Sequence, residues 1–420
     1  MQNESNPNEA CDVAIIGAGP SGAIAASILV QKGWNVKVFE RQHFPRFSIG
    51  ESLLPHCVEF IEQAGLLSDI EAEGFQFKDG AAFAMDSKYE DIYFPDKSSP
   101  GPGTVYQVRR EIFDKVLIDG AQAKGADVSF GETVLAFNST SEDLPDHAQL
   151  HISNEAGEAR VVNARFVIDA SGFGRVLPRL LDLETPSDQT VRRACFKHVT
   201  DNITHPDFDR NKILISVHPD DPKVWLWLIP LADGLSSIGV VGGAQTLEAA
   251  GADAEERLEY YVRTSGLMAD FLKDAVEARP ATELVGFSAN VKQLYGERYA
   301  LLGNAAEFLD PVFSSGVTIA MKSASLAAGL IDQQLRGEEV DWHEDFDVEL
   351  KRGVEAFRAC VNAWYDGLLQ RMIFMDGRSE DITRHFTAIL AGYAWDQKNP
   401  IVKDPKRFFK LMDALTKADI

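Results

Sequence analysis

The N-terminal part of the chain alternates between short apolar runs and a longer apolar segment. Val13–Ile16 forms a continuous apolar run, and Ala23–Val30 has the small and aliphatic residues of a buried helix. A third segment, Trp34–Phe39, again has the length and composition of a strand. This order predicts a strand, a helix and a second strand that runs parallel to the first.

A different pattern marks Val224–Pro230, where two tryptophans stand two positions apart. Alternation with a period of two places Trp225 and Trp227 on one face of a strand, and Leu226 and Leu228 on the other. The proline at the end cannot donate to a β-ladder, so we expect the strand to end there. Large aromatic side chains on a strand are usually core residues, so this pattern by itself predicts packing.

Helical patterns follow in two other places. Gln107–Asp114 opens a helix, and Glu344–Met372 carries a long amphipathic pattern. The second pattern includes the aromatic residues Phe346, Phe357, Trp364 and Tyr365. We therefore expect residues 336–420 to be helical.

The composition limits the partners that the chain can bind. Its 420 residues are 45% hydrophobic and 25% charged, which is ordinary for a globular protein of two or three domains. The 41 Lys and Arg residues are outnumbered by 64 Asp and Glu, which gives a formal net charge of −23. Such a chain repels a phosphate backbone, and no basic run offsets the repulsion, so we expect no nucleic-acid partner.

Cysteine spacing and terminal composition suggest a cytoplasmic protein. The cysteines Cys11, Cys57, Cys195 and Cys360 show neither C-x-x-C nor metal-ligand spacing, so we expect free thiols and no metal site. The first residues are polar and acidic, which does not resemble a signal peptide. No run of about 20 apolar residues predicts a membrane span.

The break between the first strand and helix reads G-A-G-P-S-G. Gly17 permits a tight turn, Gly19 lets the backbone approach a pyrophosphate, and Gly22 allows helix and sheet to pack closely. The start of the helix presents N–H groups to phosphate. Glu40, at the end of the second strand, can accept the hydroxyls of an unphosphorylated adenosine ribose. We predict a dinucleotide site; the alternative is a glycine-rich turn without a ligand.

Later segments resemble a known superfamily. Asp169–Gly172 and Gly303–Pro311 follow the glycine motif in the order found in flavoprotein hydroxylases with a glutathione-reductase-type FAD domain. The resemblance covers most of residues 10–330. It implies an α/β fold: a doubly wound FAD-binding domain of glutathione-reductase type, an inserted mixed α+β substrate domain and a helical C-terminal region.

The implied domains are discontinuous in sequence. The expected ranges are 10–50, 100–175 and 285–335 for the FAD-binding domain, 51–99 and 176–284 for the substrate domain, and 336–420 for the C-terminal region. This last region is expected to cover the substrate entrance.

Three features resemble one branch of the superfamily, the flavin-dependent (FAD) halogenases. Trp225–Pro230 matches the branch's W-x-W-x-I-P pattern, and Gly50–Ser52 resembles its G-E-S segment. Lys78 lies in a segment that resembles the one carrying its catalytic lysine. The tryptophan pair would then be both core and the wall of a reaction path.

The resemblance implies a reaction in several steps. A separate flavin reductase supplies reduced FAD, oxygen reacts at the flavin, and a bound chloride or bromide is oxidised to hypohalous acid. The acid moves through a narrow, dry channel to Lys78. The amine either holds the acid by hydrogen bonds or, if burial lowers its pKa, reacts with it to form a haloamine. An electron-rich aromatic substrate then takes the halogen.

The resemblance also assigns site residues. The halide would be bound by Ser315 and Gly316, just before a helix, and Trp225 and Trp227 would keep substrate from the flavin. The residues expected to bind FAD are Gly17, Gly19, Gly22, Glu40, Arg41, Arg46, Gln107, Arg110, Asp310 and Gly316.

Without that context, the same residues have simpler explanations. Lys78 would be a solvated surface lysine, and Ser315 would belong to a helix cap. Arg46 and Arg110 would be ion-pair partners, and Asp310 would cap a turn ahead of a proline.

Two positions depart from related patterns. Phe313 stands where the tryptophan-halogenating branch has a glutamate, so free tryptophan is an unexpected substrate. The D-P-V-F-S-S-G form is closer to the branch that acts on phenols or pyrroles, often tethered to a carrier protein. Asn304 replaces the aspartate of the wider superfamily, and its side chain can still bond a ribityl hydroxyl.

Three other functions fit the same scaffold. An FAD monooxygenase would transfer oxygen to its substrate and would need neither Lys78 nor halide. An isoprenoid double-bond reductase would work without oxygen. A non-catalytic flavin-binding partner would bind FAD and form no hypohalous acid.

Overall fold

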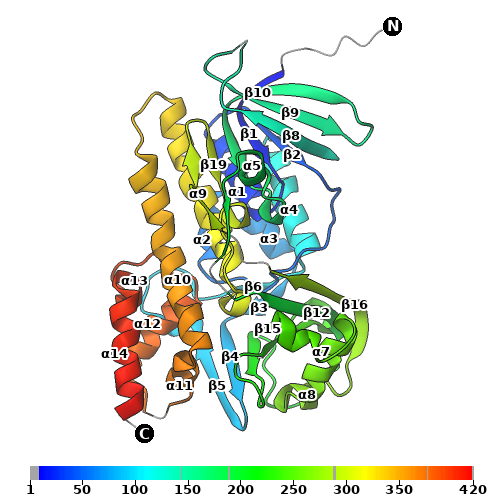
Figure 1. Ribbon diagram of the computed structural model, residues 1–420, viewed down its shortest axis with the longest axis vertical. Coiled ribbons are helices and arrows are strands. Elements are labelled where there is room, and N and C mark those ends of the chain that lie inside the picture. Colours follow the sequence, from blue (N-terminus) through cyan, green and yellow to red (C-terminus); the bar gives the residue numbers. More distant parts are fainter. Residues whose placement is uncertain (1–8, 143, 188–189, 287–289, 376, 419–420) are drawn as a thin grey trace.

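The computed structural model describes residues 9–142, 144–187, 190–286, 290–375 and 377–418. The residues 1–8, on which the expectation of no signal peptide depends, lie outside these ranges. Figure 1 shows a larger sheet and its helices at the top, a second sheet at the lower right, and a group of helices at the lower left.

The first sheet is built around the predicted parallel strands. β1 pairs in parallel with both β2 and β10, and β2 pairs in parallel with β7. The strands run in the order β18-β19-β10-β1-β2-β7, and β9 joins β8 to β10. Their bounds are β1 Glu9–Ile16, β2 Val36–Glu40, β7 Asp127–Phe130, β8 Glu132–Asn138, β9 Ala148–Asn154, β10 Ala159–Asp169, β18 Tyr295–Gly296 and β19 Tyr299–Leu301.

The central strands of this sheet are buried on both faces, and helices pack against the sheet. Val13, Ala14 and Ile15 have no exposed surface. The helix α1 (Pro20–Gln31) packs against α4 (Arg110–Ala123) and α9 (Ser315–Leu335). The smaller helices of this half are α2 Cys57–Gln63, α3 Leu67–Ala72 and α5 Val176–Leu180.

The second sheet has the strand order β16-β12-β15-β14-β13-β4-β5. All its neighbours are antiparallel except β13 and β4, which are parallel. The bounds are β4 Gly80–Met85, β5 Lys88–Tyr93, β12 Arg192–Thr200, β13 Lys212–Val217, β14 Trp225–Pro230, β15 Leu235–Gly243 and β16 Val276–Val285. Two short pairs lie outside both sheets, β3 Gln76–Lys78 with β6 Val105–Gln107, and β11 Glu184–Thr185 with β17 Asn290–Val291.

The alternation predicted for β14 is confirmed by the two cores that the second sheet separates. Trp225 and Trp227 belong to the main core, which continues into the first sheet. Leu226 and Leu228 belong to a smaller core on the other face. That face is covered by α6 Ala244–Glu248, α7 Ala254–Arg263 and α8 Leu267–Phe271.

The C-terminal region is helical, as predicted, but the pattern over 344–372 is divided. A π-helix at His343–Val348 leads into α10 (Glu349–Tyr365), and Gly367, with φ of +76°, separates it from α11 (Leu368–Phe374). A residue with a side chain rarely adopts that φ, so the glycine permits the turn. The remaining helices are α12 Glu380–Leu390, α13 Pro400–Lys403 and α14 Pro405–Ala418.

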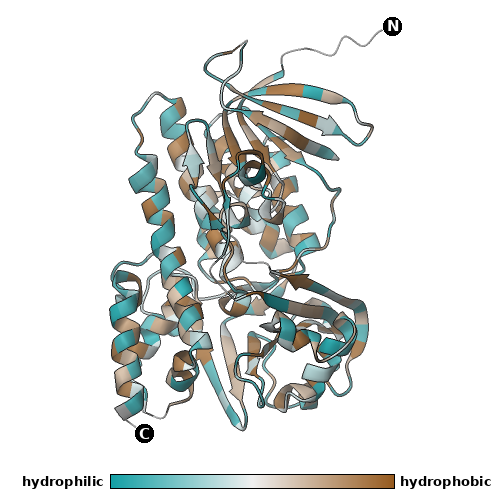
Figure 2. Cartoon of the chain, viewed as in Figure 1, coloured by the Kyte–Doolittle hydropathy of each residue, from teal (hydrophilic) through white to brown (hydrophobic). Residues whose placement is uncertain are grey.

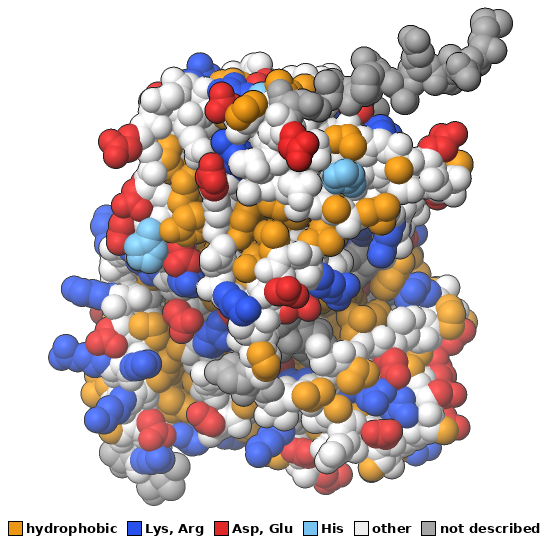
Figure 3. Space-filling view, turned by 45° about the horizontal axis from the view of Figure 1, so that its top comes forward, with side chains coloured by type: hydrophobic (Ala, Val, Ile, Leu, Met, Phe, Trp, Pro, Cys, Tyr) orange, Lys and Arg blue, Asp and Glu red, His pale blue; other side chains and the backbone are white. Residues whose placement is uncertain are grey.

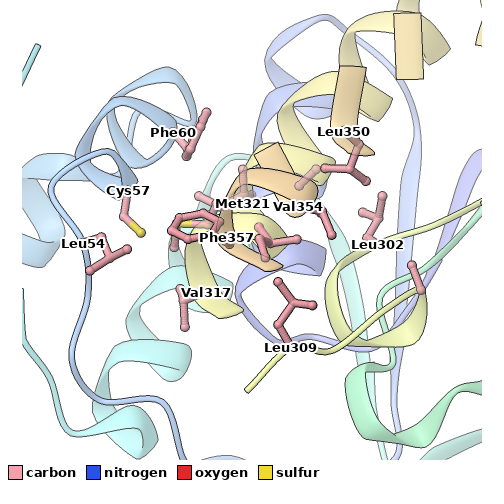
Figure 4. Packing of buried hydrophobic residues seen from close by; sticks show 14 of the residues in the cluster. Leu54, Cys57, Phe60, Leu302, Leu309, Val317, Met321, Leu350, Val354 and Phe357 are labelled. Carbon is pink, nitrogen blue, oxygen red and sulfur yellow. The ribbon is translucent and has the colours of Figure 1, made fainter. Parts of the chain in front are cut away.

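The helices α2, α9 and α10 meet in one hydrophobic cluster. Figure 4 shows Cys57 and Phe60 of α2, Met321 of α9, and Val354 and Phe357 of α10 gathered there. In Figure 2 the strands are largely hydrophobic, whereas α10 and α14 carry hydrophilic turns. The C-terminal helices are therefore packed onto the main core as part of the same structure.

Several whole-molecule properties bear on function. No helix in the described ranges has the length and apolar character needed to span a membrane. The same ranges contain no cluster of three or more His, Cys, Asp or Glu side chains that could hold a metal ion. All four cysteines are buried free thiols. On the face in Figure 3, acidic and basic side chains are interspersed around a hydrophobic band.

Candidate active site

The turn between β1 and α1 leaves no room for side chains at its glycines. Gly17 has φ of +100°, and a Cβ there would lie 2.6 Å from the carbonyl oxygen of Ala170. A Cβ on Gly22 would lie 2.0 Å from the carbonyl oxygen of Gly17. Helix α1 begins at once, with Pro20 in its first turn. The backbone is thus fixed in the close strand-to-helix turn that a pyrophosphate requires.

Glu40 closes one side of this turn. Its Oε2 accepts a hydrogen bond from the Ala18 N–H at 2.9 Å, and its Oε1 accepts one from the Gln42 N–H at 2.9 Å. Each carboxylate oxygen keeps a further lone pair for a ligand hydroxyl. The side chain is therefore oriented before any nucleotide arrives.

A single cavity of about 430 Å³ extends from this turn to the second sheet. Its wall includes both tryptophans of β14 and residues from the start of α9. Of the residues predicted for the site, those that line it are Gly17, Gly19, Glu40, Arg41, Arg46, Arg110, Trp225, Trp227 and Gly316.

Five predicted residues do not line that cavity. Gly22 lies beneath the turn, and Asp310 and Ser315 lie beside lining residues. Gln107 is fully buried and donates from Nε2 to the carbonyl oxygen of Arg210 at 3.2 Å. This hydrogen bond ties β6 to the segment that precedes β13. The Gln107 side chain is not part of the cavity wall. Lys78 lies behind Ser52, which does line the wall.

Arg46 and Arg110 are ion-pair partners and cavity residues at once. Arg110 bonds both oxygens of buried Asp114, at 2.7 and 3.0 Å, and Arg46 reaches the same carboxylate at 3.3 Å. Arg110 also donates to the carbonyl oxygen of Ile49 at 2.6 Å. The two guanidinium groups share the single negative charge of Asp114, and Arg110 fixes the loop that precedes Glu51.

Asp310 lies at the centre of a buried polar network that the sequence did not predict. Its carboxylate lies 3.0 Å from the Nε of Arg192 and accepts a hydrogen bond from the Tyr365 hydroxyl at 2.8 Å. The same hydroxyl accepts from Trp225 Nε1 at 2.9 Å. Burial raises the pKa of Asp310, while Arg192, Tyr365 and the Val312 N–H lower it.

This network joins segments that are remote in sequence. Arg192 comes from β12, Trp225 from β14 and Tyr365 from α10, and the guanidinium of Arg192 lies 3.3 Å from the centre of the Tyr365 ring. Burial is also the main cause of the raised pKa of Tyr365. No local spacing signals such a set, because only the packing of α10 brings its members together.

The second tryptophan is held by a different contact. Trp227 Nε1 donates to the Ser237 hydroxyl at 3.2 Å, and its ring lies over Gly239. A Cβ on Gly239 would lie 2.3 Å from that ring. Because β15 offers a glycine there, the indole can lie flat against the sheet and form part of the cavity wall.

The helix α9 begins directly at the predicted halide residues. Ser314 has φ of +54° and makes no side-chain cap, Ser315 is the first helical residue, and Gly316 lines the cavity. In the first turn, the Thr318 hydroxyl lies 3.2 Å from the Sγ of Cys57. The free N–H groups of a helix start favour an anion.

Lys78 ends the short strand β3 and has no solvent-exposed surface. Its Nζ donates to the Ser52 hydroxyl and to the Leu53 carbonyl oxygen, both at 2.7 Å, and lies 5.2 Å from the centre of the Phe94 ring. Burial lowers the pKa of this amine to about 7, with a small opposing effect from Cys57. No carboxylate of the described residues pairs with it, so the charged form is poorly compensated.

These features can be compared with known proteins. The sequence matches the FAD binding domain family over residues 10–346. It is 30% identical to the 1H-pyrrole-2-carbonyl-[peptidyl-carrier protein] chlorinase of Pseudomonas fluorescens, over 84% of this chain and 83% of that protein. The chain belongs to the FAD-binding family of flavin-dependent halogenases.

Solved structures agree on the fold of this halogenase-family flavoprotein. A protein described as a flavoprotein/dehydrogenase from Cytophaga hutchinsonii has a TM-score of 0.93 and 39% identity, covering 98% of this chain and 100% of its own. The myxobacterial chondrochloren halogenase CndH has a TM-score of 0.73 and 25% identity, covering 97% of both chains. The predicted fold class is thereby confirmed.

The cavity of this FAD-dependent oxidoreductase fits its cofactor. The glycine turn approaches closely enough for a pyrophosphate, Glu40 is set for a ribose, and the cavity continues to the start of α9 and the face of the second sheet. Asn304, which replaces the superfamily's aspartate, lies on the same wall. FAD is an elongated molecule that carries a ribose and a pyrophosphate beside its ring system, and the glycine turn and Glu40 fit the first two groups.

The position that holds a glutamate in the tryptophan-halogenating branch has no polar group in this flavoprotein. Phe313 is buried and meets Trp364 edge to face, with ring centres 6.1 Å apart. Trp364 also packs against Phe83 at 6.1 Å. These aromatic rings make the region around Phe313 apolar.

Proposed function

We propose that this protein is an FAD-dependent halogenase in which Lys78 delivers an oxidised halogen to an electron-rich aromatic ring. One observation carries the proposal: the Lys78 amine is fully buried, its pKa is lowered to about 7, and it is bonded to Ser52 of the cavity wall. An enzyme that transfers oxygen directly from flavin to substrate has no use for such an amine.

The lowered pKa gives Lys78 two available forms near neutrality. The charged amine has three N–H donors; Ser52 and Leu53 accept from two of them, and the third can hold hypohalous acid. The neutral amine can attack it: the nitrogen–halogen bond forms, the halogen–oxygen bond breaks, and water leaves. The aromatic substrate then takes the halogen and gives a proton back to the amine. If the neutral form reacts, product formation should increase as pH rises through about 7.

Other residues of the chain position the reactants. Reduced FAD, when bound, would allow oxygen to oxidise the halide. The glycine turn and Glu40 would hold the nucleotide half of FAD, and Arg41 and Arg46 would contact FAD from the adjoining cavity wall. The first turn of α9 would hold the halide at Ser315 and Gly316. Trp225 and Trp227 close the second-sheet side, which supports a role in keeping the substrate from the flavin.

The substrate we propose is a phenol or a pyrrole, either free or presented on a carrier protein, and two relatives are named for a carrier-bound pyrrole. One is the chlorinase above, and the other is a carrier-protein pyrrole brominase of Pseudoalteromonas luteoviolacea, 26% identical. Phe313 supports this choice, because no carboxylate stands there to assist an indole. A separate flavin reductase as partner and a cytoplasmic location complete the proposal.

The test is incubation with a flavin reductase, FAD, NADH, bromide and a panel of phenols and pyrroles, followed by mass spectrometry. The proposal requires a product whose mass shift depends on bromide. A gain of one oxygen at any halide concentration would support the monooxygenase. Reduction of a double bond without oxygen would support the isoprenoid reductase, and bound FAD with no product would support a non-catalytic partner.

A further inference from the structure

The flavin cavity contains a buried carboxyl group that has no assigned role. Glu51 is 1% exposed and lines the cavity. Its Oε1 lies 2.7 Å from Nε2 of His198, while its Oε2 is buried with no hydrogen-bond partner in the described structure. A buried carboxyl oxygen without a partner costs free energy, so its retention points to a ligand or a reaction that uses it.

The backbone fixes where Glu51 lies. Its carbonyl oxygen accepts from the Val108 N–H at 2.7 Å, and the preceding Gly50 has φ of +101°. A Cβ on Gly50 would lie 2.9 Å from Arg110 and 3.7 Å from Val317. The segment therefore passes directly beside the first turn of α9, where the halide is expected.

Glu51 and Ser52 serve two different regions. Side chains of successive residues in an extended segment point to opposite sides. Ser52 forms a bridge to Gln107 and accepts the hydrogen bond from Lys78. Glu51 instead reaches His198 on β12 of the second sheet.

His198 is held on the cavity face of that sheet. Its ring meets Phe47 edge to face, with centres 5.7 Å apart, and the guanidinium of Arg279 lies 3.5 Å from the centre of the same Phe47 ring. In the strand ladders His198 pairs with Arg279 of β16 and with Ser237 of β15. Since β16 is the edge strand, His198 lies one strand from solvent.

We propose that Glu51, supported by His198, delivers the proton that halide oxidation consumes. This inference rests on the proposed function. Reduced FAD, oxygen, halide and one proton give FAD, hypohalous acid and water. The flavin and the halide each lose two electrons and oxygen gains four; the oxygen–oxygen bond breaks, the halogen–oxygen bond forms, and the proton is carried to the oxygen that leaves as water.

The other ionisable residues on the described cavity wall are less suited to this role. Both oxygens of Glu40 accept backbone hydrogen bonds beside the glycine turn. Glu132 belongs to β8 of the first sheet and is paired with Arg160. The lining arginines cannot release a proton. Glu51 combines a place beside α9, an unpaired oxygen and an imidazole that can return its proton.

His198 would be a positioning and proton-returning residue, because it acts through Glu51. Without the proton, oxygen reduced at the flavin leaves as hydrogen peroxide: reduced FAD and oxygen give FAD and peroxide, with no halide consumed. The ratio of halogenated product to peroxide therefore reports the proton delivery directly.

The experiment compares Glu51→Gln and His198→Gln with the unaltered protein. Each is loaded with photochemically reduced FAD and mixed with oxygen, bromide and the phenol and pyrrole panel. We expect the product-to-peroxide ratio to fall by about 100-fold in Glu51→Gln and about 10-fold in His198→Gln. FAD affinity, measured by flavin fluorescence, should change less than about 3-fold. Glu283→Gln, on the opposite face of the same sheet, is the matched control and should keep the ratio unchanged.

Chemical rescue separates a proton donor from a structural side chain. Glu51→Ala should lose product, and added formate should restore part of it, whereas glycerol should not. If Glu51→Gln fails to bind FAD, His198→Gln decides, because glutamine still donates a hydrogen bond but cannot carry the proton. Unchanged ratios in both variants would overturn the inference and leave the proposed function standing. Absence of brominated product from the unaltered protein would overturn both.

Discussion

The flavin cavity and the surroundings of Lys78 are neighbours with opposite characters. The cavity is an open space of about 430 Å³ whose wall alternates backbone N–H groups, charged side chains and two indoles. The amine of Lys78 lies in closed packing, where its hydrogen bonds within the described residues go to Ser52 and Leu53 and it faces the ring of Phe94. The cavity has room for a large ligand, whereas the packing around Lys78 keeps its amine away from water.

Under the proposed function, this difference would separate the place where the oxidant forms from the place where it is used. Charged and dipolar groups line the cavity, so a polar cofactor and an anion can bind there. Around Lys78 burial lowers the pKa of the amine to about 7, and no carboxylate of the described residues offsets this effect. The hydroxyl of Ser52 is the only group that both regions share among the contacts described above.

The largest expected effect comes from removing the amine. Lys78→Ala should reduce halogenated product by about 1,000-fold or more, the scale of losing a nucleophile, while FAD binding stays within about 2-fold. Bromide-dependent product by mass spectrometry and FAD affinity by fluorescence measure the two effects. The control is Lys97→Ala, which removes another mostly buried lysine that bonds a carbonyl oxygen. Equal product from Lys78→Ala would remove the lysine from the mechanism.

A second substitution breaks the cavity and spares the lysine. Gly22→Ala places a Cβ 2.0 Å from the Gly17 carbonyl oxygen, a backbone atom that cannot move without opening the turn. We expect FAD affinity to fall by about 30-fold or more, measured by fluorescence titration. Gly33→Ala is the control, because Gly33 has φ of +92° but no atom within 4 Å of an added Cβ. Unchanged affinity in Gly22→Ala would contradict the assigned cradle.

The third prediction uses pH to measure the burial of the amine. The pKa of Lys78 is about 7 when folded and 10.5 as the ordinary value, so between these pH values the unfolded chain binds the extra proton. The cost of burying lysine is therefore full below pH 7 and disappears as pH rises through 10.5. Relative to Lys78→Met, the unaltered protein should gain about 3 kcal/mol between pH 6.5 and pH 9.5.

Thermal unfolding of both proteins across that pH range makes the measurement. All other ionisable groups are common to the two proteins, so their contributions largely cancel in the difference. A difference in stability that stays constant with pH would show that the amine titrates as an exposed lysine does.

The smallest effect probes how the C-terminal helices are joined to the cavity. Tyr365→Phe removes the hydroxyl that accepts from Trp225 and donates to Asp310. The Trp225 N–H would lose its partner and Asp310 would lose one of its three, which should cost about 1–3 kcal/mol of stability, measured by thermal unfolding. Tyr260→Phe is the control, since Tyr260 is 39% exposed. Equal loss in both variants would mean that the buried network adds nothing.

The sequence foretold some elements well because their signals are local. The glycine turn and Glu40 lie in one strand-helix-strand unit, and the alternation of β14 assigns its tryptophans and leucines to opposite cores. The pattern over 344–372 was less informative, because a helical period does not show that Gly367 interrupts it. Gln107 stays a prediction for FAD binding; its side chain bonds the Arg210 carbonyl oxygen and does not line the cavity.

By itself the sequence determined the α/β architecture and the nucleotide turn, and it singled out Lys78 as a candidate, since periodicity and short motifs act over neighbouring residues. Only the tertiary structure decided that Lys78 is dry, that Tyr365 and Arg192 surround Asp310, and that Glu51 meets His198. These contacts join residues 25 to 173 positions apart. Burial and hydrogen-bond partners arise only when distant segments pack together, and they set the pKa and reactivity of each group.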